Sequence, residues 1–69
     1  EILDLMARRL AIARAVPATI EYRARVKAGR ADVEPRLREI GRVRDDASRS
    51  PSVLRVLDRF LVAAGVPIP

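Results

Sequence analysis

Arginine is the residue type on which any chemistry of this chain must rest. The 69 residues include 14 lysines and arginines, of which only Lys27 is a lysine, and they include no histidine and no cysteine. A thiol nucleophile, an imidazole base and the usual ligands of a zinc site are therefore absent. Guanidinium groups bind carboxylates and phosphates through paired hydrogen bonds. We expect the chain to hold an anion and stabilise charge, without a metal or other cofactor.

The distribution of charge narrows the choice of anion. A formal net charge of +5 favours an anionic partner. A nucleic-acid reader typically carries a compact basic stripe, or aromatic side chains on which bases stack. Here the arginines are scattered among acids, and Tyr22 and Phe60 are the whole aromatic set. Nucleic-acid binding by a small basic helical module stays open as an alternative, and a small anionic molecule is the first expectation.

The apolar spacing predicts one long helix over residues 2–27. Its apolar residues recur every three or four positions, at Leu3, Met6, Leu10, Ala13, Val16 and Ile20. Ile2, Leu5 and Ile12 widen this stripe, so the helix is expected to face more than one neighbour. Pro17 lies inside the pattern and removes a backbone donor. Because the apolar spacing resumes at Ile20, we expect a bend there and a stop at Ala28-Gly29.

Two shorter helices are predicted after the first. Asp32 is expected to cap a helix over 33–48, with Pro35 in its first turn. Ser50-Pro51 is a start signal for a helix over 51–64, which Gly65 ends. The apolar residues expected to face the core are Val33, Leu37, Ile40, Val43 and Ala47 in the second helix and Val53, Leu57, Phe60, Leu61 and Ala64 in the third. The prediction is a single all-α domain, 1–69, of one long and two shorter helices.

The length limits what this domain does alone. A core built from 69 residues buries little apolar surface, and neither disulfides nor metal ligands supplement it. Association of two copies is the usual remedy, so we expect a homodimer. The apolar runs are too short to cross a membrane, and we expect a cytoplasmic protein without membrane contact. Because the chain begins inside an amphipathic pattern, truncation at the N-terminus is also an expectation, and a removed secretion signal stays open as an alternative.

Three segments resemble the AroQ class of chorismate mutases. Residues 1–13, EILDLMARRLAIA, resemble the "I-L-D-L-L-A-x-R-L-x-L-A" run of that family's first helix. Residues 32–36, DVEPR, are similar to its "D-P-E-R" entry to the second helix, with one residue inserted. Residues 50–57, SPSVLRVL, are similar to its third-helix start, "D-P-x-x-V-x-R-V-F". The resemblance implies a three-helix chain, often an intertwined dimer, and the Claisen rearrangement of chorismate to prephenate.

The resemblance also assigns roles to individual residues. Arg9 matches the first-helix arginine that binds a substrate carboxylate, and Arg36 is the best match for the second-helix arginine. These two residues are the predicted catalytic and substrate-binding pair, and a further arginine is expected from the partner subunit. The family's lysine, eleven residues after Arg9, falls on Ile20. Arg23 and Lys27 are the candidates to replace it in binding substrate.

The third helix departs from the family pattern. The Gln or Glu that contacts the ether oxygen falls near Ile68, and the hydroxyl-bearing position one turn earlier falls on Ala64. Losing a cation and a donor removes several kcal/mol of transition-state stabilisation, if a single donor contributes about 3 kcal/mol. A second hypothesis follows, in which a catalytically degenerate relative keeps the fold and serves as a dimerisation, regulatory or docking module.

Overall fold

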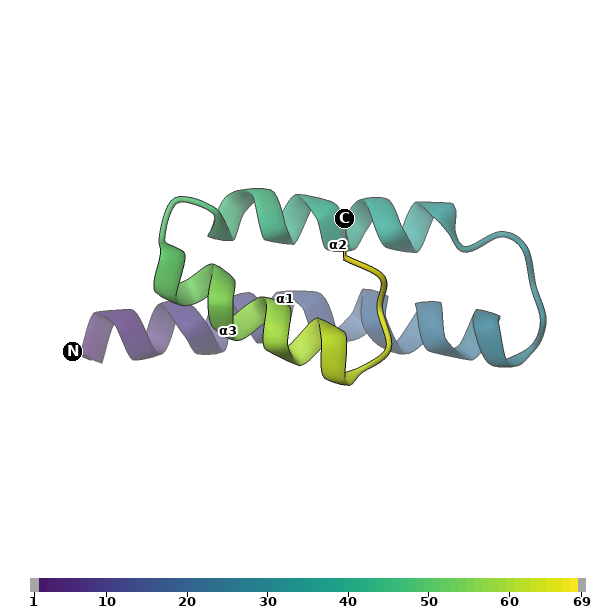
Figure 1. The fold of residues 1–69 in the computed structure, drawn as a ribbon, viewed down its shortest axis with the longest axis horizontal. Coiled ribbons are helices and arrows are strands. Elements are labelled where there is room, and N and C mark those ends of the chain that lie inside the picture. The colour runs from purple at the N-terminus through teal and green to yellow at the C-terminus, as the bar shows by residue number, and fades with distance from the viewer. Residues whose placement is uncertain (1, 69) are drawn as a thin grey trace.

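The chain forms three helices that lie side by side. The structure is a computed structural model that describes residues 2–68. The helices are α1 (Ile2–Lys27), α2 (Glu34–Ala47) and α3 (Pro51–Ala63), and the described part of the chain contains no strand. The chain reverses direction between successive helices, and residues 64–68 turn back toward α2 (Figure 1). The all-α prediction is confirmed. The observed α2 is one residue shorter than expected at each end, and α3 is one residue shorter at its C-terminal end.

Glycines in the left-handed conformation end α1 and α3. Gly29 has φ +72°, and the Arg30 N–H donates to the Arg25 carbonyl at 2.9 Å. Gly65 has φ +81°, and the Val66 N–H donates to the Leu61 carbonyl at 2.9 Å. Both are Schellman motifs, in which the glycine adopts a φ that other residues rarely take. The second motif turns Val66 back into the core, where it is 4% exposed.

The starts of α2 and α3 differ in detail from the expected caps. The prediction that Asp32 caps α2 is wrong, because the N-cap is Val33 and it makes no side-chain cap hydrogen bond. Asp32 instead accepts two hydrogen bonds of 2.8 Å from the Arg30 guanidinium. Ser50 is the N-cap of α3 as expected, yet its hydroxyl lies 3.2 Å from the Ser52 hydroxyl and does not cap the backbone. Asp32 is bound by the nearby Arg30, and Ser50 lies beside the Ser52 hydroxyl, so each side chain has a partner that competes with the helix backbone.

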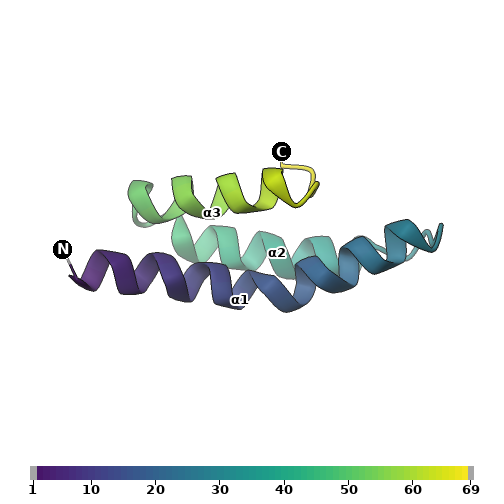
Figure 2. The same cartoon turned by 90° about the horizontal axis from the view of Figure 1, so that it is seen from below.

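The first helix continues through Pro17, as predicted, and bends near its middle (Figure 2). Proline removes one helical hydrogen bond and crowds the preceding turn, which bends the helix without ending it. Pro17 is exposed. The bend lets a helix of 26 residues follow two shorter helices along their length.

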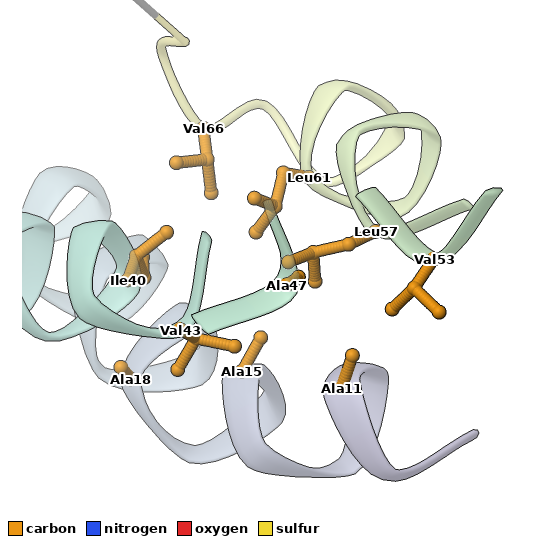
Figure 3. Close-up of a cluster of buried hydrophobic side chains, with 10 residues drawn as sticks. All are labelled: Ala11, Ala15, Ala18, Ile40, Val43, Ala47, Val53, Leu57, Leu61 and Val66. Atoms are coloured by element: carbon orange, nitrogen blue, oxygen red, sulfur yellow. The ribbon is translucent and has the colours of Figure 1, made fainter. Parts of the chain in front are cut away.

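The core is small and mixes alanines with larger residues (Figure 3). Its buried apolar residues are Ala11, Ala15 and Ala18 from α1, Ile40, Val43 and Ala47 from α2, Val53, Leu57 and Leu61 from α3, and Val66. The stripes expected for α2 and α3 are confirmed at these positions. In α1 the buried face is a different one from the predicted stripe, since Leu3, Met6, Leu10 and Ile20 are exposed. The alanines of α1 let α2 and α3 pack close to α1. Leucines at the same positions would hold these helices further away.

The described chain contains no helix that is long and apolar enough to span a membrane. Among residues 2–68 there is likewise no group of three or more acidic, histidine or cysteine side chains placed to hold a metal ion.

Candidate anion-binding site

Arg9 lies on the side of α1 that faces away from the other helices. It precedes buried Ala11 by two residues, which sets it about 160° away from Ala11 around the helix axis. Its side chain is exposed, and none of the ion pairs found between residues 2 and 68 involves it. Arg9 is therefore free to meet an anion or another molecule.

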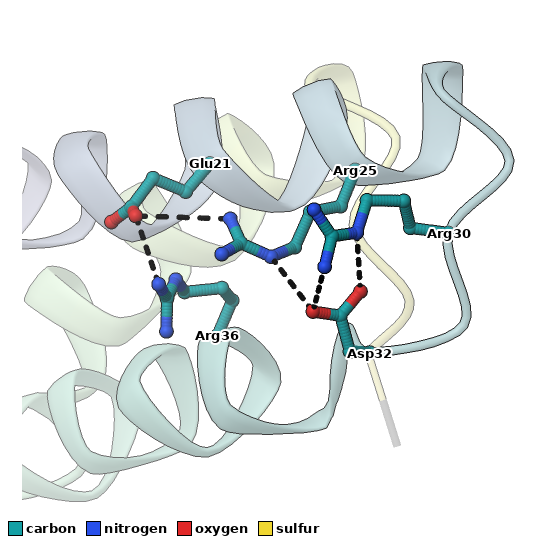
Figure 4. A network of polar contacts seen from close by, with 5 residues as sticks. All are labelled: Glu21, Arg25, Arg30, Asp32 and Arg36. Carbon is teal, nitrogen blue, oxygen red and sulfur yellow. Dashed lines mark hydrogen bonds and ion pairs between the residues drawn. The ribbon is translucent and has the colours of Figure 1, made fainter.

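Arg36 is already engaged by an acid of the same chain. Its Nη2 lies 3.0 Å from Glu21 Oε1, which joins the first turn of α2 to α1 (Figure 4). Arg25 approaches the same Glu21 oxygen at 3.8 Å and also lies 3.7 Å from Asp32. Arg36 Nε is buried and has no hydrogen-bond partner in the described part of the chain. The Glu21 carboxylate balances much of the positive charge that Arg36 would otherwise offer a ligand.

A single chain does not bring Arg9 and Arg36 together. Glu21, the partner of Arg36, follows Arg9 by twelve residues, or about 18 Å along the helix axis. The two arginines also lie toward different sides of α1. The hollow of about 290 Å³ that Arg36 lines contains Arg14, Glu21 and Glu39 and does not include Arg9. The predicted clamp of Arg9 and Arg36 is thus not assembled within one protomer.

Arg23 and Lys27, the expected substitutes for the family's lysine, lie together. With Ile20 and Ala24 they line a shallow hollow of about 310 Å³ on the outer side of α1. Arg23 and Lys27 are exposed, and neither belongs to an ion pair between described residues. Ile20 supplies an apolar side chain one helical turn before Arg23. This hollow contains the position at which the resemblance expects a lysine.

These side chains belong to one continuous line along α1, which we call the outer seam. Its residues are spaced alternately by four and three positions: Ile2, Met6, Arg9, Ala13, Val16, Ile20, Arg23 and Lys27. The seam contains five apolar residues, three cations and no acid. Ile2, Met6 and Ile20 are 74%, 60% and 62% exposed. Figure 2 shows α2 and α3 on the same side of α1. Within the described residues, the seam side chains are exposed except for Val16, which is half-buried.

The outer seam was partly visible in the sequence. Its apolar members were identified by their spacing, but that spacing does not tell which neighbour buries them. The resemblance assigns a role to Arg9 and makes Arg23 and Lys27 the candidates to replace the lysine. Their shared alignment with the apolar residues is the signal that joins the two observations, because both follow the same alternation of four and three.

The third-helix positions of the resemblance lie elsewhere. Ala64 and Ile68 are half-buried and pack against the core. Ile68 also lines an apolar hollow of about 640 Å³ beside α2, together with Leu37, Ile40 and Gly41. This hollow is formed by α2 and residues 67–68, with no contribution from α1. Neither residue supplies a hydrogen-bond donor to the outer seam.

The ionisable groups whose pKa is shifted hold helices and turns together, and they lie outside the outer seam. The hydrogen bond from the Ser52 hydroxyl, followed by the charge of Arg8, lowers the pKa of Asp4 below its usual 3.8. The hydrogen bond from Arg30 lowers the pKa of Asp32 in the same way. The paired hydrogen bonds with Asp58 raise the pKa of Arg44. These acids already have partners, and no ion pair within the described part of the chain involves a cation of the outer seam.

No family model matches this chain, and no curated protein or solved structure matches it either.

Proposed function

We propose that two copies of the chain pair through their outer seams and bind a small dicarboxylate at each end of the contact. The observation that carries this proposal is the uncovered line of apolar and cationic residues on α1. Contiguous apolar patches on a protein surface mark interaction sites. Alternate spacing by four and three positions is the pattern by which two helices pack side by side. The chain is also too short to build a large core alone, so we expect a second copy of the chain to be the partner that covers the seam.

The order of residues in the seam favours antiparallel pairing. With the two seams aligned about their midpoints, Arg9 lies opposite the partner's Ile20. Arg23 then lies opposite the partner's Met6, and Lys27 opposite the partner's Ile2. In this direction every cation meets an apolar side chain. Parallel pairing in register would oppose each cation to its own copy, and two such charges 7 Å apart repel by about 2 kcal/mol at an effective dielectric constant of 20.

Antiparallel pairing completes an anion site that one chain lacks. It brings Arg9 of one copy to the hollow that Ile20, Arg23 and Lys27 of the other copy line. Three cations then surround an apolar floor, and the twofold symmetry makes two such sites. Arg9 offers a planar pair of donors to one carboxylate, while Arg23 and Lys27 receive the second. A compact dianion satisfies this arrangement better than a monoanion does.

The resemblance to AroQ chorismate mutases supplies the reaction. We propose a chorismate mutase-type isomerase that acts on chorismate or a related dicarboxylate. The rearrangement is intramolecular, so it requires neither a protein nucleophile nor a general base. Cations that fix both carboxylates hold the substrate in a reactive conformation, and positive charge beside the ether oxygen stabilises the transition state. An arginine-rich, histidine-free and cysteine-free chain provides these functions.

A binding module without catalysis is the second candidate, and specific residues favour it. Ile20 stands where the resemblance expects the lysine, and Ala64 and Ile68 stand where it expects polar groups. Without those donors the ether oxygen depends on Arg23 and Lys27 alone. Such a domain would keep the dimer and the dianion site and would serve for regulation or docking.

Measuring the decay of chorismate absorbance tests the proposed reaction. We expect decay when the protein is added, and a decrease in rate of at least roughly 100-fold in Arg9→Gln, which removes a charged donor. Arg59→Gln, an exposed change on α3, is the matched control and keeps the rate. Arg36→Gln weakens the contact to Glu21 and leaves most of the activity. A rate that depends on Arg36 and not on Arg9 contradicts the seam site.

A further inference from the structure

We infer that dianion binding and pairing of the chains are coupled, so that the dimer assembles on its ligand. This inference rests on the proposed pairing of the outer seams and adds a regulation to it. The seam presents three cations, and its own residues include no acid to offset them. The ligand would then supply the negative charge that the paired helices lack.

The acids nearest to the seam are already bound on the other side of α1. Asp4 accepts a hydrogen bond of 2.8 Å from the Ser52 hydroxyl of α3 and pairs with Arg8. Glu21 lies 3.0 Å from Arg36 of α2. Using either acid to neutralise the seam would break a contact between helices of the same chain. Among residues 2–68, the cations of the seam therefore form no ion pair with a carboxylate.

Two opposing effects meet when the seams pair. Burial of Ile2, Met6 and Ile20 favours the contact, since all three are more than half exposed in the single chain. At each end, however, Arg9 comes within two helical turns of the partner's Arg23 and Lys27, and like charges repel. A dianion between these cations converts the repulsion into attraction. Each ligand therefore binds the dimer much more tightly than it binds the monomer.

The expected size follows from linkage. A dimer with two equivalent sites that the monomer lacks is stabilised by the factor 1 + [L]/K for each site, where [L] is the ligand concentration and K its dissociation constant. When the ligand concentration is ten times K, the factors of the two sites multiply, and the dimer dissociation constant changes roughly 100-fold. By the same linkage, ligand affinity rises with protein concentration.

Sedimentation velocity of the full chain in malate, a small dicarboxylate, tests the coupling. The comparison is with sodium chloride at the same ionic strength, because general screening acts over about 8 Å at physiological salt and is common to both. We expect the dimer dissociation constant to fall roughly 100-fold in saturating malate and to change much less in acetate. Arg9→Gln is expected to abolish the effect of malate, and Arg59→Gln to retain it.

A charge reversal separates this coupling from a loss of folding. Arg23→Glu places a carboxylate beside Arg9 of the other copy, so this variant is expected to dimerise without malate. Far-UV circular dichroism checks that its helix content is unchanged. If wild-type dimer affinity is the same in malate and in chloride, or if Arg23→Glu still requires malate, the coupling is overturned.

The same measurements distinguish the coupling from the proposed reaction. A dimer of constant affinity that converts chorismate overturns the coupling and leaves the reaction standing. A dimer that malate assembles but that leaves chorismate unchanged supports the coupling and contradicts the reaction. A chain that stays monomeric in every condition contradicts both.

Discussion

The two faces of α1 reverse the usual arrangement of an amphipathic helix. Toward α2 and α3 the helix presents Ala11, Ala15 and Ala18, all of them buried. Away from them it presents Met6 and Ile20, which are 60% and 62% exposed. A helix that served only its own domain would place the larger side chains inward, where each contributes about 2 kcal/mol when fully buried. This difference is the observation on which the proposed pairing of two chains rests.

The third helix shows the ordinary arrangement and makes the contrast clear. Its Leu57 and Leu61 are fully buried, and Val62 is its one residue among the exposed large apolar side chains of the described chain. All the other members of that set lie on α1: Ile2, Leu3, Leu5, Met6, Leu10, Ile20 and Val26. The surplus of apolar surface is therefore concentrated on one helix and not spread over the molecule.

The largest expected effect comes from enlarging the inner face. Ala15→Leu places extra carbon atoms where α1 packs against the other helices, and Ala15 is 0% exposed. We expect the free energy of unfolding to fall by about 3 kcal/mol, because an overpacked core must shift its backbone. Urea unfolding at low protein concentration measures it.

Ala13→Leu is the matched change on the outer face. Ala13 is exposed and lies in the outer seam, so the stability of the monomer is expected to change by less than about 0.5 kcal/mol. Equal losses from both variants would mean that the two faces of α1 do not differ in packing.

A polar side chain on the outer face is expected to separate the paired chains and spare the fold. Ile20→Gln replaces an exposed apolar side chain of the proposed contact, opposite the partner's Arg9, without adding a charge. We expect the dimer dissociation constant, measured in saturating malate, to rise roughly 30-fold, or about 2 kcal/mol. Light scattering measures the mass, and circular dichroism measures the helix content. A loss of helix in the monomer would show that Ile20 serves the chain's own core.

The smallest expected effect concerns the hydrogen bond between Asp4 of α1 and Ser52 of α3. In the folded chain the pKa of Asp4 is lowered below 3.8, first by the Ser52 hydroxyl and then by Arg8. A lowered pKa contributes stability that is present above the unfolded value and is lost as the pH falls through the folded one. Asp4→Asn is therefore expected to reduce the loss of stability below about pH 4.

Ser52→Ala is the matched variant for this test. It removes the hydrogen bond that is the first cause of the shift and keeps the carboxylate. We expect a similar reduction in the loss of stability in acid, measured by thermal unfolding across the acid range. If the stability of both variants falls with decreasing pH as steeply as that of the wild-type chain, the hydrogen bond between Ser52 and Asp4 is not the cause of the acid sensitivity.

Much of the fold was predictable because its signals are local. Pro51 and Gly65 delimit α3 through backbone geometry alone, and the apolar spacing identified the buried face of α2 through Ile40 and Val43. The prediction for the Asp32 cap failed because the competing partner, Arg30, becomes available only in the folded turn. A cap signal describes what a side chain can do, and its neighbours in space decide what it does.

The candidate site was predictable in its parts. Arg9, Arg23 and Lys27 were identified as anion-binding candidates from the sequence. The engagement of Arg36 by Glu21 was not predictable, because it depends on how the turn between α1 and α2 sets the register of the two helices. An arginine has the same chemistry whether or not an acid has already bound it, and only the packing tells the two cases apart.

The sequence by itself determined an all-helical chain, most of the ends of its helices and a set of side chains rich in arginine and without histidine or cysteine. These properties depend on backbone dihedral angles, on side-chain periodicity and on which functional groups are present. Only the tertiary structure decided which side of α1 is buried. Its small residues are the ones that let three helices approach closely, and the larger apolar residues, together with Arg9, Arg23 and Lys27, are left facing outward.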